Sequence, residues 1–218
     1  MQPSEIYLFA INIATLTLLG FNASLLITKK GQNFGYASLS CCFIAIAIVI
    51  CQPSLKLLAP EWRQTQLIVS LPALLIIAPS FWFYIKSLTA ESKWTLTKHD
   101  KWHFALPSIG LFISLFTLVL PNEIQHGLLV DGDDVVLKSA SPFLRYSVYA
   151  GLIITFLLVI SWVLQSAFYV VKTIVRLNRY RTHLKDIFAT TEQKEMGWLT
   201  ALALLVGIPW GLFAINLT

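Results

Sequence analysis

The chain has 218 residues, of which 56% are hydrophobic and only 12% are charged, and its formal net charge is +5. Because soluble domains usually contain about 25% charged residues, this composition excludes an ordinary water-soluble domain. The charges are also unevenly placed, since several long stretches contain none of them. This pattern is typical of a membrane protein, in which each spanning helix needs about 20 apolar residues.

Six stretches of the chain contain no Asp, Glu, Lys, Arg or His, and each is interpreted as a spanning segment. In chain order they are residues 6–28, 34–51, 67–85, 104–120, 146–171 and 198–216. Hydrocarbon offers no water to pair backbone groups, so a span exposed to lipid has to be helical. The expected fold class is therefore all-α, a polytopic membrane protein with six transmembrane helices in a single domain over residues 1–218. The fifth stretch is longer than a bilayer core requires, so we expect its helix to tilt or to continue into the cytoplasm.

The basic residues predict the orientation of these helices. Twelve of the sixteen Lys and Arg residues fall in the three loops on one side, around residues 29–30, 86–101 and 172–194. The positive-inside rule places such loops in the cytoplasm. We therefore expect the N-terminus outside and, after six spans, the C-terminus outside. The positive charge is then an orientation signal, the lipid bilayer is the expected partner, and direct nucleic-acid binding by this chain is not expected.

The longest outer segment runs from Pro121 to Arg145 and contains the sequence GLLVDGDDVVLK. Two apolar triplets flank Asp131-Gly132, and Asp-Gly between such runs is a strong signal of a β-hairpin. A small hairpin over the outer face is the expected structure. A calcium loop is the alternative, but the further spaced oxygen ligands and the closing Glu of such a loop are missing.

Few residues of the chain are suited to catalysis or to metal binding. His99 and His103 share one helical face by their spacing, but two ligands do not make a metal site, so no metal and no cofactor is expected. No Ser-His-Asp or Cys-His arrangement is recognisable, and we do not expect an enzyme; His99, Asp100 and His103 are the only candidates for a lipid-directed activity. Uncharged spans argue against ion-coupled transport, whereas transport of a neutral solute stays open.

The third span is unusual because it contains two prolines, Pro72 and Pro79. Each proline removes a helical hydrogen bond and leaves a carbonyl without its partner, near residues 68 and 75. Inside a membrane, neighbouring helices, water or a ligand must satisfy these carbonyls. Together with hydroxyl, amide and indole groups in other spans, the kinked helix could line a pocket for a small, mostly apolar ligand.

The same span carries a recognisable motif. In LPALLIIAPSFWFYIKSLT, residues 71–89, the matching positions are Leu71-Pro72, Pro79, Trp82, Tyr84, Lys86 and Ser87-Leu88-Thr89. This stretch resembles the third-helix motif of the membrane-embedded N-terminal sensor region of AraC-type transcriptional regulators, with Ala78 in place of the usual Gly. Two further stretches are similar to that family, and their matching residues are His103, Phe104 and Pro107, then Leu184, Phe188, Thr190, Glu192 and Trp198-Leu199.

The resemblance implies seven helices followed by a cytoplasmic helix-turn-helix domain, whereas this sequence shows six helices and no such domain. We therefore expect a truncated regulator, an excised fragment, or a relative that acts through an output-protein partner or a homodimer. The implied function is a sensory input domain in a bacterial inner (cytoplasmic) membrane that binds a small apolar or amphiphilic signal and couples it to a DNA-binding output. The alternatives are the sensor region of a histidine kinase and a small transporter subunit for a neutral solute. The expected ligand-binding residues are Pro79, Trp82, Tyr84, His103 and Trp198.

Overall fold

The computed structural model describes residues 3–31, 33–92, 94–132, 135–138 and 140–187, and the regular structure of these residues is helical throughout. The expected all-α class is thus confirmed for this part of the chain. The elements in chain order are α1 (Pro3–Thr28), α2 (Phe34–Ile50), α3 (Gln52–Leu58), η1 (Pro60–Trp62), α4 (Arg63–Leu88), η2 (His99–Phe104), α5 (Ala105–Val119), α6 (Asn122–His126), η3 (Gly127–Asp131), α7 (Val135–Lys138) and α8 (Pro142–Ile187).

Four helical stretches among the described residues are long and apolar enough to cross a membrane. They are Ile6–Thr28, Pro60–Leu88, His99–Val119 and Pro142–Thr182. A fifth candidate exists if α2 and α3, which meet at an angle of 53°, form one bent span. These candidates coincide with the first five stretches expected from the sequence. The sixth, residues 198–216, lies outside the described residues, so a count of six helices is not established.

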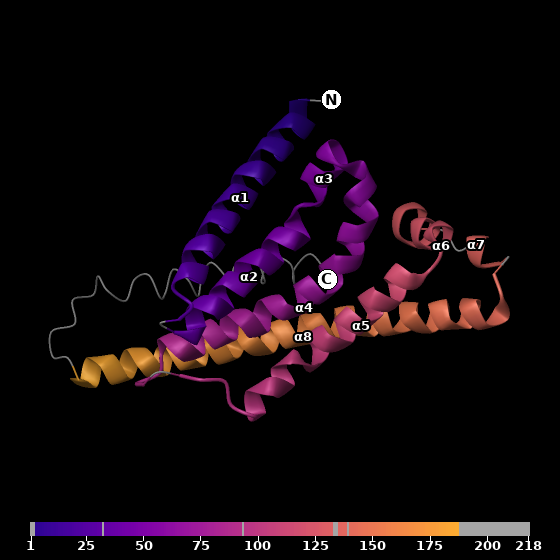
Figure 1. Cartoon of the computed structure of the whole chain (residues 1–218). Coiled ribbons are helices and arrows are strands. Elements are labelled where there is room, and N and C mark those ends of the chain that lie inside the picture. The colour runs from indigo at the N-terminus through magenta and orange to yellow at the C-terminus, as the bar shows by residue number, and fades with distance from the viewer. Residues whose placement is uncertain (1–2, 32, 93, 133–134, 139, 188–218) are drawn as a thin grey trace.

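Helix α8 has 46 residues and runs along the whole bundle, with α6 and α7 close to its beginning (Figure 1). At 1.5 Å per residue it is about 69 Å long, which is more than twice a 30 Å hydrocarbon core. The expected helical continuation of the fifth stretch past residue 171 is therefore confirmed. No proline interrupts α8 after its first residue, Pro142, so the apolar and the basic halves belong to one continuous helix.

Helix α4 is the centre of the fold, because α2, α5 and α8 all pack against it. Its side chains Leu75, Phe83 and Ile85 are fully or almost fully buried. Pro72 is accommodated by α5, whose Ser114 Oγ donates a hydrogen bond of 2.7 Å to the carbonyl of Ile68. The expectation that a neighbour satisfies the carbonyl near residue 68 is thus met by a serine side chain.

Close approach between helices explains two glycines. A Cβ on Gly110 of α5 would lie 3.5 Å from Pro72 Cα and 2.5 Å from Leu75 Cδ1. A Cβ on Gly35 of α2 would lie 2.7 Å from the Ser87 hydroxyl at the end of α4. Next to Gly35, the Asn33 side chain caps α2 and accepts a hydrogen bond from the same Ser87 hydroxyl. The glycines therefore let α2 and α5 approach α4 closely.

The expected β-hairpin at residues 127–138 is wrong. The described residues of this segment form η3 and the short helix α7, which follow α6, and Gly132 adopts a left-handed φ of 69° where η3 ends. Its apolar residues point into a core in which Leu137 packs with Leu120, Ile124 and Val148. The left-handed glycine thus ends a helical turn instead of forming a hairpin turn, because packing onto α5 and α8 buries the apolar residues better than an isolated hairpin would.

Replacing Gly110 by Ala should destabilise the fold by overpacking the contact between α4 and α5. The new Cβ would lie 2.5 Å from Leu75 Cδ1, and Leu75 is 0% exposed, so its side chain has no space to move. We expect the free energy of unfolding in detergent to fall by about 1–3 kcal/mol.

Gly20→Ala is the matched control, since no atom lies within 4 Å of a Cβ at that position in α1. It should be neutral or slightly stabilising, because Ala is the better helix former. Equal unfolding free energies for the two variants would contradict the close packing of α5 on α4.

Candidate ligand-binding site

An apolar cavity of about 380 Å³ lies between α2, α4 and α8. Its size falls in the range of pockets that hold small molecules, about 300–1,000 Å³. Most of its wall is aliphatic or aromatic, and polar groups come chiefly from α8. Representative lining residues are Cys42, Ile46, Phe81, Tyr84, Ser166 and Thr173. A ligand that fits this cavity would therefore be mainly apolar with few polar groups.

Thr173 is the residue of this wall whose buried hydroxyl lacks a hydrogen-bond partner among the described residues. Its side chain is 3% exposed. A helical threonine usually returns its hydroxyl to a carbonyl three or four residues earlier. A buried hydroxyl without a partner costs about 1–3 kcal/mol. An oxygen or nitrogen atom of a bound ligand is one way to satisfy this group.

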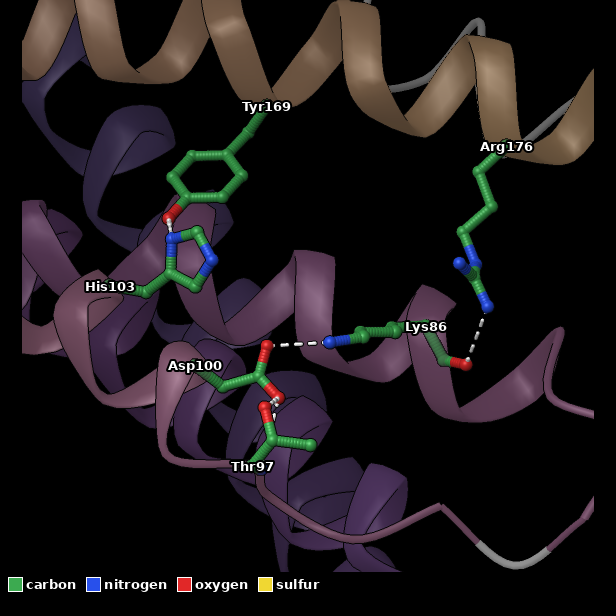
Figure 2. Close-up of polar contacts among 6 residues, drawn as sticks. All are labelled: Lys86, Thr97, Asp100, His103, Tyr169 and Arg176. Carbon is green, nitrogen blue, oxygen red and sulfur yellow. Dashed lines mark hydrogen bonds and ion pairs between the residues drawn. The ribbon is translucent and has the colours of Figure 1, made fainter.

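Tyr169 links the cavity to the segment before α5. Its ring lines the cavity wall, and its hydroxyl shares a hydrogen bond of 2.5 Å with His103 Nδ1 in η2 (Figure 2). The centres of the two rings lie 5.5 Å apart. One side chain of α8 thus touches both the cavity and η2.

An aromatic cluster holds η2 against α4. Phe83 is 1% exposed, and the ring centres of Trp94, His103 and Phe104 lie 5.4–5.7 Å from its own. Aromatic pairs at such distances contribute about 0.5–1.5 kcal/mol beyond the burial of their area. His103 is therefore fixed by Phe83 on one side and by Tyr169 on the other.

A buried ion pair joins α4 to η2. Lys86 Nζ donates to Asp100 Oδ1 at 2.5 Å, and the Asp100 side chain is 3% exposed (Figure 2). The other carboxylate oxygen, Oδ2, accepts hydrogen bonds from the backbone N–H and the hydroxyl of Thr97, at 3.0 and 2.7 Å. A buried charge needs such partners because its desolvation is costly. These contacts fix the connection between α4 and α5.

Arg176 joins α8 to the end of α4. Its Nε donates to Thr89 Oγ1 at 2.5 Å. Its Nη2 donates to the Lys86 carbonyl at 3.4 Å, as Figure 2 shows. The Lys86 carbonyl is one of the last four of the helix, which have no partner within it. The arginine therefore caps α4 and holds α8 against it.

The expected ligand-binding residues lie in different environments. Tyr84 lines the cavity, while Pro79 is buried inside α4 next to it. Trp82 faces a separate groove beside the basic part of α8, and His103 reaches the cavity only through Tyr169. Trp198 lies outside the described residues. The side chains of the other positions between 184 and 199 that match the family are not described either. The structure thus brings Tyr84 to the cavity and separates it from Trp82.

Sequence reasoning included hydroxyl and indole groups of the fifth span, such as Trp162 and Ser166, in a possible pocket, but it missed Tyr169 and Thr173 of α8. The residues Trp162, Ser166, Tyr169, Thr173 and Arg176 follow one another at spacings of four and three, so they lie on one face of the helix. Such a stripe of hydroxyl, aromatic and basic groups within an apolar stretch was a readable signal. All of them except Arg176 line the cavity.

The candidates for lipid chemistry do not form a shared site. The Asp100 carboxylate pairs with Lys86 and accepts from Thr97, whereas the His103 ring shares its hydrogen bond with Tyr169. His99 is exposed, with its ring centre 6.5 Å from that of His103. Among the residues that the structure describes, no group of three or more His, Cys, Asp or Glu is placed to hold a metal ion.

Comparison with known proteins identifies no relative, since no family model, no curated protein and no solved structure matches the chain. The resemblance of residues 71–89 to AraC-type sensor regions therefore stays a prediction. The helices define this chain as an all-α protein with apolar helices of membrane-spanning length.

Removing Lys86 alone should be more damaging than removing both charges. Lys86→Met leaves the buried Asp100 carboxylate without its cation, and Lys86 is itself 23% exposed, so we expect the free energy of unfolding to fall by about 1–3 kcal/mol. The double variant Lys86→Met/Asp100→Leu should recover more than half of that loss, because no charge stays buried. Lys98→Met, at an exposed position nearby, is the control and should change stability by less than about 0.5 kcal/mol. A double variant as unstable as Lys86→Met would argue against a buried, paired carboxylate.

Proposed function

We propose that this protein is a membrane-embedded sensory input domain that binds a small apolar or amphiphilic molecule between α2, α4 and α8. The observation that carries the proposal is the apolar cavity of about 380 Å³, whose wall contains the Thr173 hydroxyl, a group without a partner among the residues that the structure describes. Apolar walls with one or two polar groups are typical of small-molecule sites, because the polar groups fix the orientation of the ligand.

Membrane insertion is supported by the surface of the helices. In the most apolar windows of the α1 and α8 spans only 6% and 11% of the residues are buried. The apolar side chains Phe112, Val119 and Phe156 are 69%, 85% and 64% exposed. Water-soluble monomers rarely expose apolar patches of this extent. A surrounding bilayer is the environment in which such a surface is stable.

The orientation proposed from the sequence is supported by the arrangement of the basic segments. The Asn33 side chain contacts Ser87, and Arg176 contacts Thr89, so the ends of three basic segments meet at one end of the bundle. By the positive-inside rule, that end faces the cytoplasm of a bacterial cell and the N-terminus lies outside. The signal would then be delivered on the side where a cytoplasmic output acts.

Coupling is proposed to run through α8. A ligand in the cavity contacts Tyr169, whose hydroxyl holds His103, and two turns further along α8 Arg176 holds the end of α4. A ligand shifts such an arrangement only if it binds one position of α8 more tightly than another. The output is proposed to be a DNA-binding domain or a histidine kinase that acts together with this chain, as a fused domain, an associated protein or a second copy.

Ligand binding is testable with 1-decanol, an apolar chain with one hydroxyl, as the probe. A probe present at ten times its Kd should raise the free energy of unfolding by about 1.4 kcal/mol. Thr173→Leu should abolish this stabilisation, because leucine removes the hydroxyl and fills part of the cavity. Thermal unfolding in a detergent with shorter chains provides the measurement.

Thr182→Leu is the matched control, since Thr182 is exposed on the same helix and its hydroxyl bonds within the helix. That variant should keep the full stabilisation by the probe. Equal stabilisation of wild type, Thr173→Leu and Thr182→Leu would mean that decanol acts through the detergent, and the cavity proposal would be abandoned. Solute uptake by vesicles that carry the protein would instead favour the transporter alternative.

Coupling is testable with Tyr169→Phe, which removes one hydroxyl and keeps the cavity wall. We expect wild type to show slower amide hydrogen exchange in residues 97–104 when decanol is bound, since the ligand steadies Tyr169 and hence His103. Tyr169→Phe should bind the probe with similar affinity and lose this slowing. Slowing that persists in Tyr169→Phe would show that the contact with His103 does not transmit the signal.

A further inference from the structure

A second recess, separate from the cavity, lies beside the ends of α4 and α8. This basic groove has a volume of about 480 Å³ and is lined by Trp82 and Thr89 of the α4 end and by a basic stretch of α8. It is open to the surroundings on the side of the exposed Val171 and Val175. Its wall is therefore both cationic and apolar.

The cations of the groove follow one helical face. Lys172, Arg176 and Arg179 are spaced by four and three residues, so their side chains project to the same side of α8. Glu91 is the carboxylate that contributes to the same wall, which leaves an excess of positive charge. The groove thus favours an anionic occupant.

The donors of these cations are incompletely used within the described residues. Lys172 Nζ lies over the rings of Phe168 and Trp82, at 4.4 and 5.6 Å from their centres, which orients the ammonium group without a hydrogen-bond acceptor. Two of the five N–H groups of Arg176 donate hydrogen bonds, one to Thr89 Oγ1 and one to the Lys86 carbonyl. No hydrogen bond from the Arg179 guanidinium to another described residue is present. Phosphate oxygens are the natural acceptors for such a set of donors.

The apolar side of the groove distinguishes a lipid from a free anion. Lys172 directly follows the uncharged stretch 146–171, so the groove lies where the lipid-facing surface of α8 ends. Phe168, Val171 and Val175 are 53%, 60% and 45% exposed and continue from the groove along α8. An acyl chain would cover these side chains, whereas an inorganic anion would leave them uncovered.

We infer that the basic groove binds the phosphate of an anionic phospholipid, with Lys172, Arg176 and Arg179 as its ligands and the acyl chains along the exposed face of α8. This inference goes beyond the proposed function, from which it takes only membrane insertion. The groove is a defined site and not a diffuse basic surface, because its cations lie on one face of α8 next to the end of α4.

Native mass spectrometry of the purified protein in detergent measures how many phospholipids stay bound to it and tests the inference. The probes are dioleoyl phosphatidylglycerol, which is anionic, and dioleoyl phosphatidylcholine, which has no net charge. Wild type should retain phosphatidylglycerol about tenfold or more above phosphatidylcholine, and Lys172→Gln/Arg179→Gln should lose most of that preference, since each cation near the phosphate contributes separately. Arg176 is left intact because it also holds α4.

Lys29→Gln/Lys30→Gln is the matched control. It removes the same charge at exposed positions on the α1–α2 turn, away from the groove. The control should keep the preference of wild type. Equal losses in the two double variants would show that diffuse attraction, and not a site, retains the lipid, and would overturn the inference.

Two further measurements make the outcome decisive. Inorganic phosphate at about 10 mM should not displace phosphatidylglycerol; full displacement would identify a free-anion site and overturn the lipid assignment. Unchanged size-exclusion elution of Lys172→Gln/Arg179→Gln, together with a stabilisation by decanol equal to that of delipidated wild type, would show that the variant is folded and that the cavity is intact. Failure of the lipid site is thereby separated from failure of the proposed ligand site.

Discussion

The structure depends on a single constraint: the carbonyl groups of α4 must find partners in apolar surroundings. Pro72 removes the helical partner of the Ile68 carbonyl, and the hydroxyl of Ser114 replaces it, which fixes the position of α5 along α4. The other neighbours also donate to the backbone of α4: Ser38 of α2 donates to the Ser80 carbonyl, and Arg176 of α8 donates to the Lys86 carbonyl in the last turn. Each helix packed on α4 is therefore positioned by a polar contact to its backbone, and apolar packing fills the space between these contacts.

The cavity is a consequence of this arrangement. Helices α2 and α8 are both fixed to α4, and the space between them is closed by side chains of all three helices. The wall is apolar because the helices that form it are apolar. The few hydroxyl groups on it are therefore the groups that can hydrogen-bond to a ligand. Thr173 is the clearest case, because its hydroxyl has no partner within the described part of the chain. A ligand with one polar atom and an apolar body would satisfy the whole surface of such a space.

The sequence predicts much of the fold and only part of the site. Uncharged stretches indicate the helices because a bilayer restricts the backbone to helical structure, and the proline rule locates the carbonyl of Ile68. The hairpin expectation failed because a left-handed glycine such as Gly132 serves equally as a hairpin turn and as the end of a helical turn. The contacts of Tyr169 and Asp100 depend on which helices become neighbours, and no local pattern contains that information. The cavity needs three helices at once, so only the folded arrangement reveals it.

Helix α8 contributes side chains to both recesses. Thr173 faces the cavity and Lys172 faces the basic groove, although the two residues are neighbours in sequence. Successive residues of a helix point about 100° apart, so one helix presents different faces to the two recesses. Because α8 continues without a break through both regions, a shift of α8 along α4 moves its two faces together. A movement that enlarges the cavity therefore also displaces the cations of the groove relative to Trp82 and to the end of α4. An occupant of either recess that prefers one position of α8 would change the affinity of the other by the same factor, since coupling between binding free energies is reciprocal.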